Sequence, residues 1–189
     1  MSDTATTEHI RSDDEAVPGS ILQTERLRLR LLTEADAAFM CALLNSPAFV
    51  QNIGDRGVRS LEDAARYLRE GALAAYAQHG FGMYLVELRG DATPVGLCGL
   101  VRREGLDADD IGFAFLPEHC GCGFGSESAA AVLAYARDTL RLPRLVAIVL
   151  ETNVPSVRLL QRLGLRYERT LRLPGGNEDL QLYAIDWPR

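Results

Sequence analysis

The alternation of apolar and polar residues along the chain predicts a mixed α/β fold. Positions 24–31 alternate polar and apolar side chains, as in a strand with one buried face. The run at 144–150 is apolar after its first residue, Arg144, as in a strand buried on both faces. Further strands are expected at 81–88, 94–101, 110–115, 167–173 and 179–186.

Helices are expected where apolar residues recur at helical spacing after a capping residue. Thr33 with Asp36 and Ser60 with Asp63 resemble capping boxes, and Asn153 can cap a later helix. The predicted helices run from 33 to about 45, from 60 to about 78, over 125–140 and over 155–163.

The order of these elements, β-α-α-β-β-β-α-β-α-β-β, predicts a mixed sheet with helices on both faces. Residues 46–59 contain a proline and two glycines and are expected to form a loop beside a site. The first 20 residues are polar and acidic, so a disordered tail is expected at 1–20. The rest, 21–189, has the length of a single domain.

Charge and hydropathy exclude several classes of function. The net charge is −6, and the first 20 residues carry −4 of it, which leaves about −2 for the remainder. Binding to nucleic acid requires a basic excess, which is missing, and no apolar run is long enough to span a membrane. With no secretion signal, a cytoplasmic protein is expected. A mildly acidic body suits a cationic substrate such as an amine.

The four cysteines do not indicate a metal site or disulfides. Cys41 and Cys98 stand in apolar surroundings, as buried small side chains do. The sequence HCGC at 119–122 holds three potential zinc ligands, but zinc usually takes four and no second Cys/His cluster follows. No metal is therefore expected.

The candidate chemistry lies in the segment 111–127, IGFAFLPEHCGCGFGSE, where a strand leads through glycines into a helix. Unpaired N–H groups and the helix dipole make such a helix start a binding site for anions. The spacing does not match a dinucleotide fingerprint, which requires a third glycine at position 126, nor a P-loop, which requires a lysine. A phosphate-bearing ligand of another kind is therefore expected.

Three motifs in this order resemble the GNAT N-acetyltransferase superfamily. The loop C-G-C-G-F-G-S-E-S at 120–128 is similar to the W-G-x-G-Y-A-T-E-A of its Rim-like branch, the ribosomal-protein N-terminal acetyltransferases. T-E-R-L-x-L-R occurs at 24–30, and N-x-x-S followed by L-G-L occurs between 153 and 165. The resemblance implies a mostly antiparallel twisted sheet of about seven strands, splayed in the middle.

The resemblance also implies acetyl-CoA as donor and a primary amine as acceptor, with direct attack in a ternary complex. Loop amides would hold the pyrophosphate, the end of the strand at 110–115 would pair with the pantetheine arm, and Asn153 would bind that arm. The implied cofactor residues are Ala114, Phe115, Cys120, Gly121, Cys122, Gly123, Phe124, Gly125, Ser126, Asn153 and Ser156.

The catalytic roles follow from the same resemblance. The Phe115 N–H would polarise the thioester carbonyl. Many relatives carry a tyrosine acid seven residues after the asparagine, but here that position is Leu160, so Ser156 is expected to stabilise the departing thiolate. A carboxylate would accept the amine's proton through water, and Glu87, Asp110 and Glu151 are candidates that no spacing separates.

Several alternatives remain open at this stage. Asn153 and Ser156 can serve as plain helix caps, and Glu127 fits a structural place near a helix start. The acceptor is either a protein N-terminus or a small amine, and the protein either a monomer or a homodimer. Leu160 also permits a non-catalytic acyl-CoA sensor on the same fold.

Overall fold

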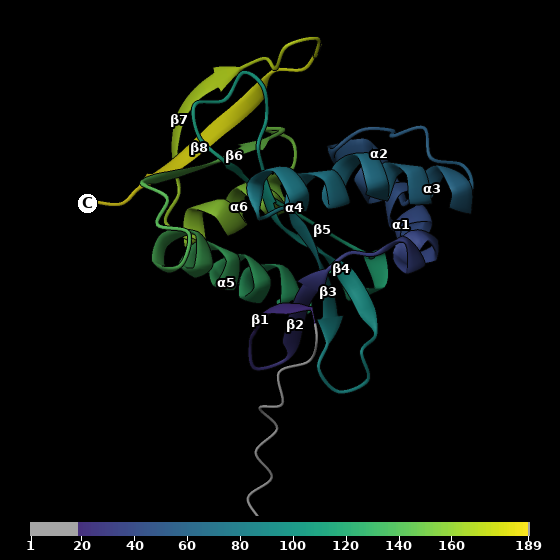
Figure 1. Ribbon diagram of the computed structural model, residues 1–189. Coiled ribbons are helices and arrows are strands. Elements are labelled where there is room, and N and C mark those ends of the chain that lie inside the picture. The colour runs from purple at the N-terminus through teal and green to yellow at the C-terminus, as the bar shows by residue number, and fades with distance from the viewer. Residues whose placement is uncertain (1–18, 189) are drawn as a thin grey trace, which may run out of the picture.

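The computed structural model describes residues 19–188, which form a single eight-stranded sheet (Figure 1). The strands are β1 (Ser20–Gln23), β2 (Leu27–Leu31), β3 (Met83–Leu88), β4 (Pro94–Val101), β5 (Asp110–Phe115), β6 (Arg144–Val149), β7 (Arg166–Leu171) and β8 (Leu180–Asp186). Their order in the sheet is β1-β2-β3-β4-β5-β6-β8-β7. All neighbours are antiparallel except β5 and β6, which confirms the predicted mixed, mostly antiparallel sheet.

The middle of the sheet is splayed. Parallel β5 and β6 pair at one position only, Asp110 with Val146, and then diverge. The side chain of Asp110 takes part in this separation, because its carboxylate accepts the N–H of Ile148 at 3.3 Å. That N–H would otherwise bond to the β5 backbone in a continuous parallel ladder. The splay therefore opens a gap along the outer edge of β5.

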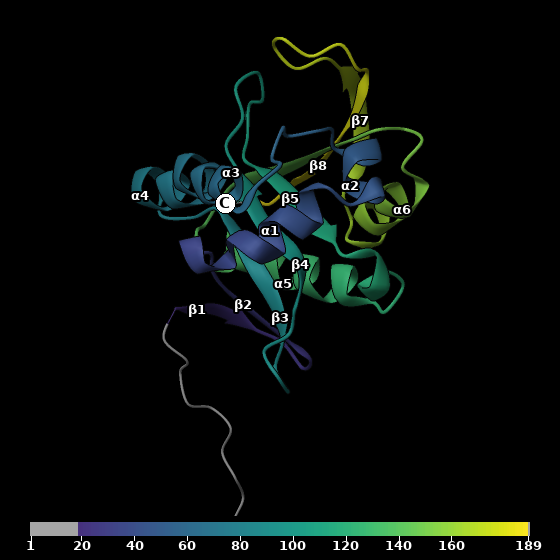
Figure 2. The same ribbon diagram turned by 90° about the vertical axis from the view of Figure 1, so that its right-hand side faces the viewer.

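Helices cover both faces of the sheet (Figures 1 and 2). They are α1 (Ala37–Leu44), α2 (Pro47–Asn52), α3 (Leu61–Leu68), α4 (Ala74–His79), α5 (Phe124–Asp138) and α6 (Val154–Arg162). Leu85 and Leu97 belong to the core under α1 and α3, whereas Val86 and Cys98 belong to the core under α5. Successive strand residues thus point to opposite faces, as the period of a strand requires.

Three details differ from the predictions. The expected strand at 24–31 is one arm of a hairpin, because Thr24 turns back on Leu27 and β1 precedes it. The expected loop at 46–59 contains α2, which Ser46 caps by accepting the Phe49 N–H at 3.3 Å. The expected helix at 60–78 widens into one π-helical segment, Arg69–Leu73, between α3 and α4.

The start of the chain is described only in part. Residues 1–18 of the predicted tail lie outside the described residues, and β1 begins at Ser20, inside the range 1–20 that was expected to be tail. Within residues 19–188, no helix has the length and apolar character needed to cross a membrane.

Candidate active site

Three cavities meet at the splay. The loop groove, about 640 Å³, runs from the glycine loop along the end of β5 to the start of α6. The splay cavity, about 320 Å³, lies between β5, β6 and the turn between β7 and β8. The helix cavity, about 450 Å³, lies under α1, α3 and α4. Ile53 and Phe113 line all three, so these cavities converge at the outer edge of β5.

The loop groove collects the predicted cofactor residues. Every one of them lines it except Cys122, although they come from three separate elements. The carbonyl of Cys122 instead accepts a hydrogen bond from Arg26 at 3.0 Å. Three of the loop residues that line the groove are glycines, Gly121, Gly123 and Gly125, which offer only backbone atoms to it.

Gly123 sets the start of α5. Its φ of 83° is left-handed, and it occupies the N-cap position without a side chain to cover the helix end. The N–H groups of Phe124, Gly125 and Ser126 therefore have no partner inside the helix. With the positive end of the helix dipole, they form a site that fits a phosphate.

The backbone of β5 supplies donors at the other end of the groove. Leu116, just after β5, donates its N–H to the carbonyl of Val95 in β4 at 3.0 Å. The two residues are therefore a hydrogen-bonded pair of the antiparallel ladder between β4 and β5. Bonded and non-bonded pairs alternate in an antiparallel ladder, so the N–H groups of Phe113 and Phe115 point away from β4. They face the gap left by the splay.

This geometry refines one prediction and adds a residue. The N–H of Ala114 is directed to Leu97 in β4, so Ala114 lines the groove but has no free N–H for a ligand. Phe113, which was not predicted, presents its N–H to the same gap as Phe115. Strand alternation is the signal that could have found it, because residues two apart face the same edge.

Asn153 and Ser156 lie where the groove meets the splay cavity. The Asn153 side chain accepts the Ser156 N–H at 3.3 Å, which confirms that Asn153 caps α6. Both residues also line both cavities. Leu160, at the position where many GNAT enzymes carry a tyrosine, is 1% exposed, so it belongs to the core.

The structure separates the three candidate carboxylates. Only Asp110 lines a cavity, the splay cavity. It is 2% exposed, and Arg103 donates to it at 2.5 Å. Burial raises the pKa of Asp110 to about 6, while Arg103 and the Ile148 N–H oppose the rise. A carboxylate titrating near neutral pH at the edge of a cavity is suited to accept a proton.

Glu87 and Glu151 are not placed for that role. Glu87 is buried in β3, where Arg28 and Arg30 bind its carboxylate at 2.5 and 3.0 Å, so it forms part of a structural ion-pair network. Glu151 is exposed in the turn before α6. Neither lines the three cavities, so the structure does not bring these two predicted bases to the groove.

A clamp links the N-terminal motif to the glycine loop. Thr24 donates to Glu127 at 2.5 Å, and the Arg26 Nε donates to the same carboxylate at 2.7 Å. Arg26 also reaches the Cys122 carbonyl and covers the Phe124 ring at 4.8 Å. The two motifs, a hundred residues apart in the chain, thus form one unit that fixes the start of α5.

The clamp predicts that Arg26→Ala weakens binding of CoA, the ligand that the resemblance in sequence implies, about fivefold, because a mispositioned loop costs roughly 1 kcal/mol. Titration calorimetry with CoA measures the effect. Arg137→Ala is the matched control, since Arg137 pairs with Asp138 at the other end of α5, touches no residue of the clamp and lines none of the three cavities. Equal CoA affinity in the two variants would refute the clamp's role.

Arg162 is a groove residue that sequence reasoning missed. It ends α6 and donates to the Ser126 hydroxyl at 3.5 Å, which places a cation beside the glycine loop. A basic residue is common in the last turn of a helix, where it interacts with the helix dipole, so Arg162 carries no separate signal in the sequence. In the described part of the chain, no group of three or more His, Cys, Asp or Glu residues is arranged to hold a metal.

Comparison with known proteins adds the family. The model described as "Acetyltransferase (GNAT) domain" matches residues 26–166. An N-acetyltransferase of Bacillus subtilis (strain 168), YoaA, itself described as uncharacterised, is 31% identical over 175 residues, covering 89% of this chain and 98% of that protein.

Two solved structures with lower identity share the fold. RimL, a ribosomal L7/L12 α-N-protein acetyltransferase in complex with CoA, has a TM-score of 0.72 and 22% identity, covering 86% of this chain and 95% of its own. A spermidine N-acetyltransferase from Vibrio cholerae in complex with CoA and spermine has a TM-score of 0.71 and 20% identity, covering 86% and 96%.

Proposed function

This chain belongs to the GNAT acetyltransferase family, and we propose that it transfers the acetyl group of acetyl-CoA to a primary amine. One observation carries the proposal: the loop groove joins a phosphate-sized cradle of backbone N–H groups to the unpaired edge of β5. The CoA in complexes of RimL and of the Vibrio cholerae spermidine N-acetyltransferase supports the choice of donor.

The groove offers a place for each part of the donor. The first-turn N–H groups of α5 and the guanidinium of Arg162 would bind the pyrophosphate. The outward N–H groups of Phe113 and Phe115 would pair with the pantetheine arm, and Asn153 would add an amide contact. One of the two β5 N–H groups would then polarise the thioester carbonyl, an effect of about 2.7–4 kcal/mol in comparable sites.

The donor supplies an activated acetyl group: the amine nitrogen bonds to the carbonyl carbon as the carbon–sulfur bond breaks. The amine must lose a proton, and Asp110 would accept it, directly or through water, from the side of the splay cavity. The Ser156 hydroxyl, between the groove and that cavity, would donate to the departing thiolate.

The role of Ser156 predicts that Ser156→Ala lowers kcat about ten- to a hundredfold, the weight of one hydrogen bond to a charged group. The CoA dissociation constant should hardly change, because the Asn153 cap uses the backbone N–H of Ser156, which the variant keeps. Steady-state thiol release and CoA titration measure the two quantities. An unchanged kcat would exclude the role.

A non-catalytic acyl-CoA sensor is the second candidate, favoured by one observation: Leu160 replaces the tyrosine acid of many relatives. Acetyl-CoA should raise the melting temperature under both candidates. Release of free CoA that depends on an added amine would exclude the sensor, whereas binding without turnover of any amine would favour it.

A further inference from the structure

We infer that the acceptor is an amine that carries both a carboxylate and an apolar side group, in the manner of a free amino acid. This inference rests on the proposed function and deepens it. It follows from the helix cavity, from its junction with the splay cavity and from one arginine at that junction.

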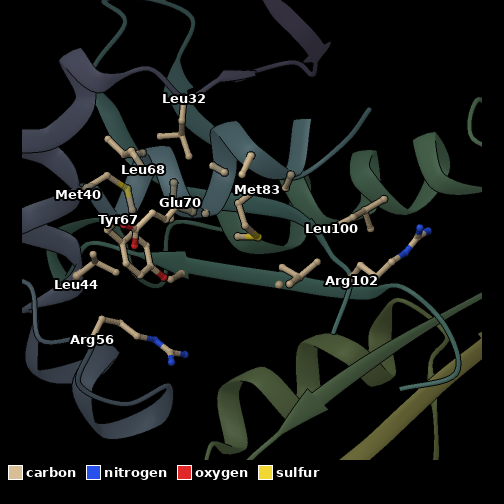
Figure 3. Close-up of a pocket in the computed structure, with 18 of the residues that line it drawn as sticks. Leu32, Met40, Leu44, Arg56, Tyr67, Leu68, Glu70, Met83, Leu100 and Arg102 are labelled. Carbon is tan, nitrogen blue, oxygen red and sulfur yellow. The ribbon is translucent and has the colours of Figure 1, made fainter. Parts of the chain in front are cut away.

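The helix cavity has the lining of a site for an apolar group. Figure 3 shows Met40, Leu44, Tyr67 and Leu68 on one side of it, with Met83 facing them from the sheet. At about 450 Å³ it has the size of a small-molecule site and can take an aromatic or branched side group.

A local irregularity lies in the helix wall of this cavity. The π segment Arg69–Leu73 interrupts the helix, and Gly71 in that segment lines the cavity. Gly71 is exposed, and a Cβ added there would meet no atom within 4 Å, so a larger side chain can be introduced at this edge of the cavity without a clash. Glycine in a helix costs about 1 kcal/mol against alanine, and single π turns are frequent at functional sites. Both features suit a wall shaped for a ligand.

The junction of the two cavities is cationic. The residues that line both are Ile53, Arg56, Arg103, Gly112 and Phe113. Arg103 is neutralised by Asp110. Arg56 donates only to the Ile53 carbonyl, at 3.3 Å, and in residues 19–188 it forms no ion pair with a carboxylate.

The carboxylates nearby do not cancel this charge at the junction. Glu70 lines the helix cavity alone, from the π segment, and Glu178 lines the splay cavity alone, from the turn between β7 and β8. Arg102, which also lines the helix cavity, is paired with Asp109. Among the residues that the structure describes, Arg56 is thus an exposed cation without an ion-pair partner that lines the same two cavities as Phe113, near which the acceptor must meet the thioester. Its planar fork matches a carboxylate.

A polyamine fits this junction poorly. Its ammonium groups would lie beside Arg56, and like charges in proximity oppose binding. A peptide N-terminus fits less well than a free amino acid, because its first carbonyl belongs to a neutral amide. The weakly acidic net charge of the whole chain favours a cationic substrate. The positive charge at the junction of the two cavities favours an anionic group instead, and the junction is what the acceptor contacts.

Four acceptors test the inference by amine-dependent thiol release with saturating acetyl-CoA. L-Phenylalanine has both the carboxylate and the apolar side group. L-Phenylalaninamide lacks the carboxylate, glycine lacks the side group, and spermidine has neither and carries only positive charge. In the unaltered protein, L-phenylalanine should show the highest kcat/KM of the four. Arg56→Gln should lower kcat/KM for L-phenylalanine about tenfold or more and change that for L-phenylalaninamide less than twofold. Gly71→Leu should lower kcat/KM for both phenylalanine acceptors and leave kcat/KM for the acceptor glycine unchanged.

Arg59→Gln is the matched control, because Arg59 lies in the same segment, is paired with Asp55 and lines none of the three cavities. It should behave as the unaltered protein with every acceptor. CoA should raise the melting temperature of all variants equally. A preference for spermidine or L-phenylalaninamide, or an equal effect of Arg56→Gln on both phenylalanine acceptors, would overturn the inference while leaving acetyl transfer intact. Absence of turnover with every amine would instead count against the proposed function.

Discussion

Gly123→Val should abolish measurable binding of CoA, a loss of at least about a hundredfold in affinity. A β-branched residue is strained at a φ of 83°, and its Cβ would lie 3.2 Å from the Arg26 guanidinium. The side chain would also intrude on the N–H groups that open α5, at the N-cap position where Gly123 leaves them uncovered. Both effects act on the cradle that we assign to the pyrophosphate. Titration calorimetry with CoA measures the loss.

Gly125→Ala separates loss of the cradle from general damage to the loop. Gly125 has no positive φ, and an added Cβ would lie 3.5–3.8 Å from Phe115 and Leu159, an ordinary packing distance. This variant should bind CoA within a few-fold of the unaltered protein. Normal binding by Gly123→Val would refute the loop assignment.

Asp110→Asn should lower kcat/KM for the amine by at least about a hundredfold, the lower range of a general base's contribution. Asparagine keeps an oxygen that can accept the Ile148 N–H, so the splay should persist while proton acceptance is lost. In the unaltered protein, kcat/KM should fall more steeply below pH 6 than above it, because protonated Asp110 accepts no proton. Asp110→Asn should lose this additional fall below pH 6 and keep only the pH dependence that comes from protonation of the substrate amine.

Asp109→Asn is the control for Asp110→Asn, because it removes the charge of the neighbouring carboxylate and leaves the Ile148 contact of Asp110 in place. Asp109 is also buried and paired with an arginine, Arg102 at 2.8 Å, but it lines none of the three cavities. Its variant should share any loss of stability and keep the pH profile. If Asp110→Asn retains the acid limb near pH 6, another group accepts the proton.

Local signals in the sequence were sufficient for most of the fold. The capping pairs at Thr33 and Ser60 and the cap at Asn153 all lie at helix starts, because such residues satisfy N–H groups that nothing else can reach. The glycine loop was found for a similar reason, since a left-handed φ at a helix start restricts the residue type.

Features that depend on contacts between distant segments could not be predicted in this way. The edge strand β1 is short and its side chains are mostly half-buried, so its pattern is weak. Spacing in the sequence does not distinguish the three candidate carboxylates as bases. The fold does, because it pairs Glu87 with Arg28 and Arg30 and places Asp110 at a cavity. The clamp between Arg26 and Glu127 is likewise visible only when the strands are assembled.

The most direct test of acetyl transfer is a single-turnover reaction followed by mass spectrometry of the acceptor and a thiol assay in the same sample. The protein, acetyl-CoA and L-phenylalanine are mixed, and both products are counted. Equal amounts of free CoA and N-acetylated amine, absent without protein and strongly reduced with Gly123→Val, are the predicted result. If CoA binds but neither product forms with this or any amine tested, the chain is not an amine acetyltransferase.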